Sequence, residues 1–143
     1  MRAKRIEIAL AVLLVSSPAW AGPVQVSDAW IRSLPAKLPA AGYFTLRNTS
    51  GKEVSLTGAQ SSACGMLMLH KSTQNGGMGS MDDVTSVAVP PGGTVKFAPG
   101  GYHLMCMDPT PAIAPGAMVS VTLSFSDGSK SQTSFAVKNA QGK

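Results

Sequence analysis

Apolar and polar residues alternate in short segments along most of this chain, which is the pattern of half-buried β-strands. The clearest case is residues 119–125, where Val119, Val121, Leu123 and Phe125 alternate with serine and threonine. Such alternation places every second side chain on the same face of a sheet. The same criterion predicts further strands at 24–32, 40–48, 53–57, 64–70, 84–89, 94–97, 102–107 and 132–137.

Glycine and proline turns separate these strands, as at Pro90-Pro91-Gly92-Gly93, and no internal repeat or linker interrupts the series. Seven to nine short strands of this kind predict one all-β domain, a sandwich or small barrel, over residues 22–143. Residues 71–81 are rich in serine, threonine, asparagine, glutamine and glycine, so we expect a flexible loop there. Asp82 and Asp83, which follow, are interpreted as solvating this loop.

The first 21 residues differ from the rest. Arg2, Lys4 and Arg5 precede an apolar run, and small residues at Ala19 and Ala21 follow it. This order is typical of a secretory signal peptide, and the apolar run is short for a membrane span. We expect cleavage after Ala21 and export from the cytoplasm; an uncleaved anchor is the alternative.

The charged residues exclude some functions. The net charge is +5, but lysine and arginine do not cluster as they do where a protein follows a phosphate backbone, so nucleic acid is not an expected partner. The chain has seven carboxylates and no visible Ser/His/Asp set, which argues against an enzyme.

Both histidines and six of the eight methionines fall between Met66 and Met107. Imidazole and thioether together suit a soft cation such as Cu(I) or Ag(I), whereas zinc sites use thiolate and imidazole. His103 and Met105 leave one face of a strand two residues apart, His70 ends another strand, and Met81 lies in the predicted loop. We therefore predict a Cu(I) site made by His70, Met81, His103 and Met105.

The remaining methionines in this stretch are assigned differently. Met66, Met68 and Met107 alternate with leucine and cysteine on predicted strands, so packing within the strands is the favoured interpretation. Met78, in the predicted loop, is at most a reserve sulfur ligand.

Cys64 and Cys106 form an even pair in a chain that we expect to be exported, which favours a disulfide; two buried, unpaired thiols are the alternative. Cys106 adjoins Met105 and raises the question of a thiolate copper ligand. It has the opposite strand parity to His103 and Met105, and no histidine follows it, so a structural disulfide is favoured over a thiolate ligand.

The order His70-x10-Met81-x21-His103-x-Met105 resembles the copper-binding motif of the periplasmic copper chaperones of the PCu(A)C type. The resemblance extends over almost all of residues 22–143, and is most specific at 90–95 and 99–105. The segments 27–32, 40–44 and 119–123 are similar to flanking strands of that family.

The resemblance implies a cupredoxin-like Greek-key β-sandwich or barrel that holds Cu(I) near its surface and passes it to an acceptor protein. In this family the acceptor is usually the binuclear copper centre of cytochrome c oxidase subunit II, often with a Sco-type thioredoxin-fold protein taking part. We expect a monomer with one Cu(I). Two alternatives remain at this point: a blue-copper electron-transfer cupredoxin that uses Cys106, and an exported β-sandwich interaction module without metal.

Overall fold

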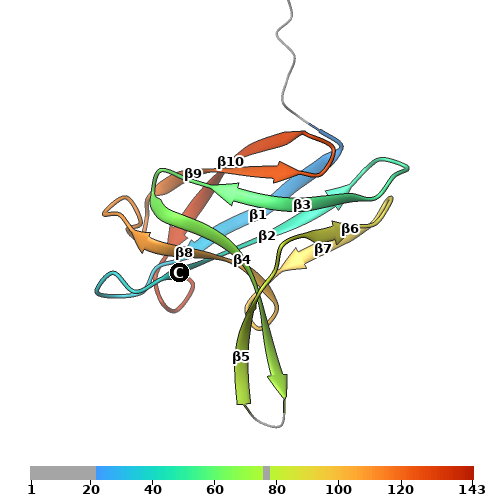
Figure 1. Ribbon diagram of the computed structural model, residues 1–143. Coiled ribbons are helices and arrows are strands. Elements are labelled where there is room, and N and C mark those ends of the chain that lie inside the picture. Colours follow the sequence, from blue (N-terminus) through green and yellow to red (C-terminus); the bar gives the residue numbers. More distant parts are fainter. Residues whose placement is uncertain (1–21, 76–77) are drawn as a thin grey trace, which may run out of the picture.

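The computed structural model describes residues 22–75 and 78–143, and all regular structure in this part of the chain is β-strand (Figure 1). The predicted signal peptide, residues 1–21, and the pair Gly76-Gly77 lie outside the described residues. The strands are β1 (Val24–Arg32), β2 (Ala40–Asn48), β3 (Val54–Gln60), β4 (Cys64–Asn75), β5 (Met78–Asp83), β6 (Val87–Val89), β7 (Thr94–Phe97), β8 (Tyr102–Pro109), β9 (Met118–Phe125) and β10 (Lys130–Lys138).

The strands pair in the order β5-β4-β8-β2-β1-β10-β9-β3-β6, with β7 also paired to β2. The β1–β10 pair is parallel, and the other registered pairs are antiparallel. Figure 1 shows β3, β9 and β10 lying across β1, β2 and β8, so the sheet bends over on itself. Within the described residues β5 and β6 end the order without pairing to each other, which leaves the sheet open. The all-β prediction is confirmed, with ten strands in place of seven to nine.

The hydrophobic core lies between the two layers and follows the predicted alternation. Phe44 of β2 stacks on Phe97 of β7 with ring centroids 4.4 Å apart, and meets Phe135 of β10 edge-on at 5.6 Å. Each of these rings is at most 2% exposed. Burial of one such side chain stabilises the fold by roughly 1.5–3 kcal/mol, so the inward residues of both layers hold the sandwich together.

One polar side chain in the core has all of its hydrogen-bonding groups used. Asn48, at the end of β2, is fully buried. Its amide nitrogen donates to the carbonyl oxygens of Lys52 at 2.6 Å and Val89 at 3.0 Å. Its side-chain oxygen accepts from the backbone N–H and the hydroxyl of Ser50. This residue therefore joins the β2–β3 turn to β6 without an unsatisfied buried group.

The described residues of the segment predicted to be a flexible loop are paired β-strands, and the loop prediction is wrong for them; Gly76 and Gly77 lie outside the described residues. β4 continues past His70 to Asn75 and pairs with β5 from His70↔Asp83 to Asn75↔Met78. Figure 1 shows this hairpin extending away from the rest of the sheet. Residues 71–73 and 79–83 are mostly polar, and the Thr73 and Ser80 hydroxyls are 2.7 Å apart, so these segments lack the apolar alternation of a half-buried strand. The backbone hydrogen bonding between β4 and β5, rather than burial of apolar side chains, defines these strands.

The predicted strand at 84–89 is also shorter than expected. Only Val87–Val89 forms a strand, β6, which pairs with β3. Val84 lies just after β5, where its N–H donates to the carbonyl oxygen of Leu69 at 2.9 Å. This hydrogen bond holds the chain against β4 directly after β5 ends.

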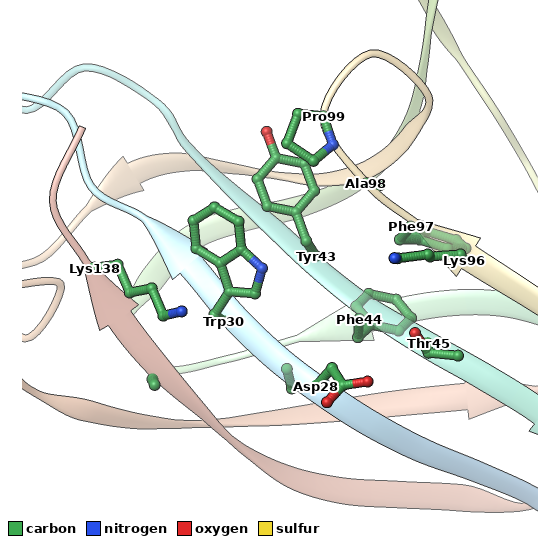
Figure 2. Close-up of a pocket in the computed structure, with 12 residues that line it drawn as sticks. Asp28, Trp30, Tyr43, Phe44, Thr45, Lys96, Phe97, Ala98, Pro99 and Lys138 are labelled. Atoms are coloured by element: carbon green, nitrogen blue, oxygen red, sulfur yellow. The ribbon is translucent and has the colours of Figure 1, made fainter. Parts of the chain in front are cut away.

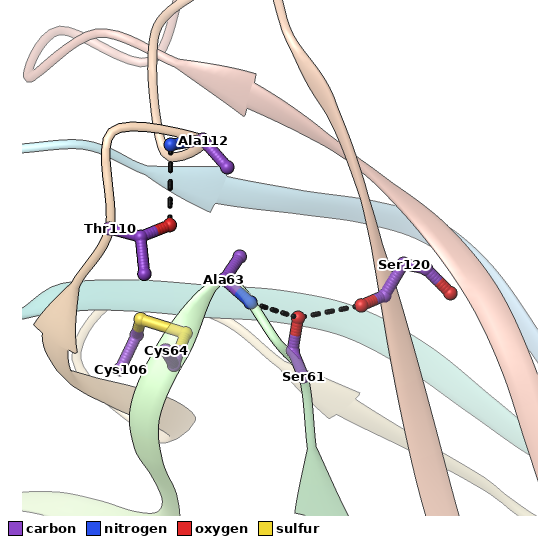
Figure 3. Close-up of a disulfide and its surroundings, with 7 residues drawn as sticks. All are labelled: Ser61, Ala63, Cys64, Cys106, Thr110, Ala112 and Ser120. Carbon is purple, nitrogen blue, oxygen red and sulfur yellow. Dashed lines mark hydrogen bonds between the residues drawn. A yellow bond between two sulfur atoms is a disulfide. The ribbon is translucent and has the colours of Figure 1, made fainter.

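Cys64 and Cys106 form a disulfide with a Cα–Cα distance of 5.4 Å (Figure 3). The bridge joins the start of β4 to β8, and Cys106 is only 1% exposed. Beside it, the Ser61 hydroxyl donates to the carbonyl oxygen of Ser120 at 2.7 Å, which ties this corner to β9. The bridge thus fastens the two strands that carry the histidines.

Candidate metal site

The predicted ligands gather on three neighbouring strands, because β4 lies between β5 and β8. His70 of β4 is directly opposite His103 of β8 and also opposite Asp83 of β5. Residues directly opposite each other in an antiparallel pair share a face, with Cβ atoms about 4.5–5.5 Å apart. The two imidazole rings meet edge-on with centroids 5.6 Å apart. Strand register thus brings together two histidines that are far apart in sequence.

His103 has one ring nitrogen fixed and the other free. It is 3% exposed, and its Nδ1 lies 3.2 Å from the carbonyl oxygen of Gly101. A carbonyl oxygen can only accept, so Nδ1 carries the proton and Nε2 keeps its lone pair. Nε2 is buried and has no hydrogen-bond partner. Gly101 is itself held in place, because its carbonyl oxygen also accepts from the Ser72 N–H at 3.0 Å.

The environment of His103 keeps its ring neutral. Burial lowers the pKa of His103; the hydrogen bond to Gly101 opposes this effect, and the nearby His70 adds to it. A neutral imidazole with a free Nε2 is the form that binds a metal ion, and a carbonyl oxygen that fixes the other nitrogen is a common supporting contact.

His70 has a different partner. Its Nε2 lies 2.9 Å from Oδ1 of Asp83, although the two groups are not aligned as a hydrogen bond. The His70 side chain is 13% exposed and that of Asp83 is 76% exposed. Since Nε2 faces a carboxylate, Nδ1 is the nitrogen left to bind a metal; it is buried and has no partner. The interpretation of Asp83 as only solvating a loop was therefore wrong, and the 71–83 hairpin is what brings it to His70.

The two thioethers flank the histidine pair from opposite ends. Met81 of β5 is opposite Ser72, two residue pairs beyond the His70–Asp83 pair, and Met105 of β8 is two residues from His103 in the other direction. Diagonal neighbours of this kind lie about 7–8 Å apart at Cα, within reach of a long side chain. Met81 is 60% exposed and lines a hollow with Ser72, Ser80 and Gly100. The strand register thus brings all four predicted ligands to one region of the sheet.

The assignment of Met66, Met68 and Met107 to packing is not what the structure shows. Met66 is 58% exposed, Met68 and Met107 are half-buried, and the three do not belong to the hydrophobic core cluster. The inward positions beside them are taken by Leu67, Leu69, Leu104 and Cys106. The three methionines share a strand face with the histidines, as their spacing predicted, but this face is not packed into the core.

Neither cysteine offers a thiolate ligand, since the Sγ atoms of Cys64 and Cys106 are bonded to each other. In the described part of the chain no group of three or more histidine, cysteine, aspartate or glutamate side chains is placed to hold a metal ion. A metal held at the histidine pair would therefore need the methionine sulfurs. This removes the ligand set of a blue-copper centre.

A separate hollow lies over β1, β2 and β7, where Trp30, Tyr43, Phe97 and Pro99 are among the lining residues (Figure 2). The Arg32 guanidinium stacks over Trp30 at 5.4 Å and over Tyr43 at 5.5 Å. Burial raises the pKa of Tyr43, and the positive charge of Arg32 partly opposes this. These groups form a packed aromatic and cationic cluster without the soft ligands of the histidine site.

Comparison with known proteins places the chain in a family. Residues 24–137 match the model of the LpqE-like family, described as "Putative lipoprotein LpqE-like". The chain is 38% identical over 120 residues to "Putative lipoprotein Lxx21020" from Leifsonia xyli subsp. xyli, covering 83% of this chain and 72% of that protein.

Solved structures share the fold. The copper-bound PCuAC domain from PmoF2 superimposes with a TM-score of 0.70 at 22% identity, covering 82% of this chain and 94% of that one. The solution structure of apo-DR1885 from Deinococcus radiodurans gives 0.64 at 30% identity, covering 100% and 97%. Its CuI form gives 0.66 at 31% identity, covering 84% and 81%. The predicted cupredoxin-like fold is thereby confirmed, and the chain belongs to the LpqE-like family, with the fold of the PCuAC domains.

Proposed function

We propose that this protein is a Cu(I)-binding copper chaperone, with His70, Met81, His103 and Met105 as the ligands. The observation that carries the proposal is the buried histidine pair. His103 Nε2 and His70 Nδ1 are buried and unpartnered, on rings 5.6 Å apart. Buried polar atoms without a partner are costly, and a metal ion shared by the two rings would satisfy both.

The other two ligands indicate which metal is bound. Met81 and Met105 supply neutral thioether sulfur, a soft donor that favours Cu(I) over zinc or hard divalent ions. Asp83 faces His70, but no further carboxylate or thiolate in the described residues completes a zinc-type set. The similarity to DR1885, which has been solved in a CuI form, supports the same metal.

Transfer of the metal, rather than storage, is supported by the position of the ligands. His103 is 3% exposed whereas Met81 is 60% exposed, so the site has an inner imidazole and an outer thioether. An incoming ligand from an acceptor can replace the exposed sulfur while the buried imidazole still holds the ion. No chemical reaction beyond this ligand exchange is part of the proposal.

The proposal is tested by competition for Cu(I) with a chromophoric chelator. The wild type is expected to hold one high-affinity Cu(I) without an intense visible band. His103→Ala and Met105→Ala should each weaken it by about a hundredfold or more, since even changes behind a metal ligand cost about 10–100-fold. Met118→Ala is the matched control, because Met118 is 63% exposed on β9. Undiminished affinity in both ligand variants would overturn this ligand set, whereas a wild type that takes up no Cu(I) would favour an interaction module without metal.

The acceptor is a separate part of the proposal. We propose the binuclear copper centre of cytochrome c oxidase subunit II, with a Sco-type protein taking part. Mixing the Cu(I)-loaded protein with a soluble domain carrying that centre should move the metal to the domain, as followed by mass spectrometry. Retention of Cu(I) by the loaded protein would reject this acceptor and leave the binding site unaffected.

We further propose that the protein works as a monomer in the periplasm after removal of residues 1–21. The description of the family as a lipoprotein family supports export. In residues 22–75 and 78–143 no helix is long and apolar enough to cross a membrane. N-terminal sequencing of the protein recovered from the periplasm should begin at Gly22, and a chain that still carries Met1 would contradict cleavage.

A further inference from the structure

Three methionines outside the proposed ligand set lie side by side on the outer face of the β4–β8 pair. Met66 is directly opposite Met107, and Met68 is directly opposite Met105. We call Met66, Met68 and Met107 the methionine row. Opposite residues on one face have Cβ atoms about 4.5–5.5 Å apart, and successive pairs are about 6.5–7 Å apart along the strands. Flexible methionine side chains at these spacings can bring three sulfur atoms to one point.

The packing of the sheet does not explain this row. The inward positions of the same strands are filled by residues such as Leu69, Leu104 and Cys106, which are at most 6% exposed. Met66, by contrast, is 58% exposed. On the next strand, Met105 is opposite Ala41, a single methyl group that covers little of the face. Met66 is therefore exposed and Met68 and Met107 are half-buried, and none of the three belongs to the hydrophobic core.

We propose that the methionine row is a second site for Cu(I) or Ag(I), made of thioethers alone and adjoining the histidine site through Met105. Thioether sulfur is a soft, neutral donor that selects these ions over zinc, calcium and magnesium. It carries no proton to displace, so binding needs no deprotonation. Without an imidazole or a charged ligand, this site is the weaker of the two and fills after the histidine site.

The two sites are continuous along the sheet. Met68 is the diagonal neighbour of His103 as well as of Met107, since Met68 is opposite Met105 on β8. The Met68–Met105 pair is the next pair on this face after His70–His103. An ion held by the methionine row therefore lies next to the histidines along the same two strands. A second ion can be loaded there or passed along the face through Met105. The proposal shares its choice of ion with the proposed function, but it does not depend on metal binding at the histidines.

Titration with Ag(I), which has the softness of Cu(I) without its oxidation, tests the second site. The full protein is labelled with ¹³C at the methionine methyl groups and followed by NMR, with native mass spectrometry for stoichiometry. The wild type should bind two Ag(I), and the methyl signals of Met66, Met68 and Met107 should shift during the second equivalent. The signal of Met118 is the internal control and should not move.

Two multiple variants separate this site from the proposed function. Met66→Leu/Met68→Leu/Met107→Leu should bind one Ag(I), whereas His70→Ala/His103→Ala should lose the first ion and still shift the row signals. Met66→Leu alone, at an exposed position, keeps the test valid if the triple variant does not fold. It should weaken the second Ag(I) on the order of tenfold, the scale of losing a supporting group at a metal site.

Two results would overturn the second site. One is a triple leucine variant that still binds two Ag(I). The other is a wild type in which the signals of Met66, Met68 and Met107 stay unmoved with two ions bound, because the second ion then lies elsewhere. If the wild type binds no metal at His70 and His103, this result counts against the proposed function and not against the second site.

Discussion

The disulfide between Cys64 and Cys106 allows a prediction with a calculable magnitude. Its two cysteines are 42 residues apart. In the chain-entropy description, a cross-link that closes a loop of that length lowers the entropy of the unfolded chain, which raises its free energy by about 4 kcal/mol at 25 °C. We therefore expect Cys64→Ala/Cys106→Ala to lower the free energy of unfolding by about that amount, and the melting temperature by roughly 12–20 °C at about 3–5 °C per kcal/mol.

The same variant should retain the metal site. β4 and β8 stay paired through their backbone register from Met66↔Met107 to Lys71↔Tyr102, and both histidines lie in this paired region. Below its melting temperature the double variant should therefore bind Cu(I) within about threefold of the wild-type affinity, a difference below 1 kcal/mol. Both cysteines are replaced because a single variant would leave one thiol as a new soft ligand.

Guanidinium unfolding measures the first effect and chelator competition the second. Chemically reduced wild type is the matched control, because it loses the cross-link while keeping both sulfur atoms in the core. A loss below 1 kcal/mol in both samples would refute the loop-closure reasoning. A tenfold loss of Cu(I) affinity in a folded double variant would show that strand pairing alone does not position the histidines.

Three further predictions concern single side chains. Met81→Ala should lower the Cu(I) affinity at least about tenfold in chelator competition. The melting temperature should change little, because Met81 is 60% exposed. Met118→Ala should change neither quantity, and an unchanged affinity in Met81→Ala would remove Met81 from the ligand set. Asn48→Ala should cost about 1–3 kcal/mol in guanidinium unfolding, because it leaves the buried carbonyl oxygen of Val89 without its donor. A cost below about 1 kcal/mol would mean that water replaces the amide. The pKa of Tyr43 is raised by burial, so above pH 10 the unfolded chain loses this proton first and stability falls as pH rises further. Tyr43→Phe should flatten that fall in thermal melts, and an identical decline in the variant would contradict the assignment.

Strand parity was readable from the sequence because it is a local property. Successive side chains on a strand point to opposite faces, so Met66, Met68 and His70 had to share a face, as did His103, Met105 and Met107. The spacing of the histidines and methionines was equally visible, and it singled out the four proposed ligands before any fold was known. The alternation at residues 119–125 likewise matches β9 (Met118–Phe125) closely.

The tertiary structure decided which strands meet, at what register, and which face is outside. His70 lies opposite His103 only because β4 and β8 pair over that stretch. The polar 71–83 segment became a hairpin because its backbone continues the ladder of β4, and this also brought Asp83 to His70. Met66 is on the outside because leucines from the same strands fill the inside. Local alternation sets two faces for each strand, but the choice between them depends on long-range burial, which short segments of sequence do not encode.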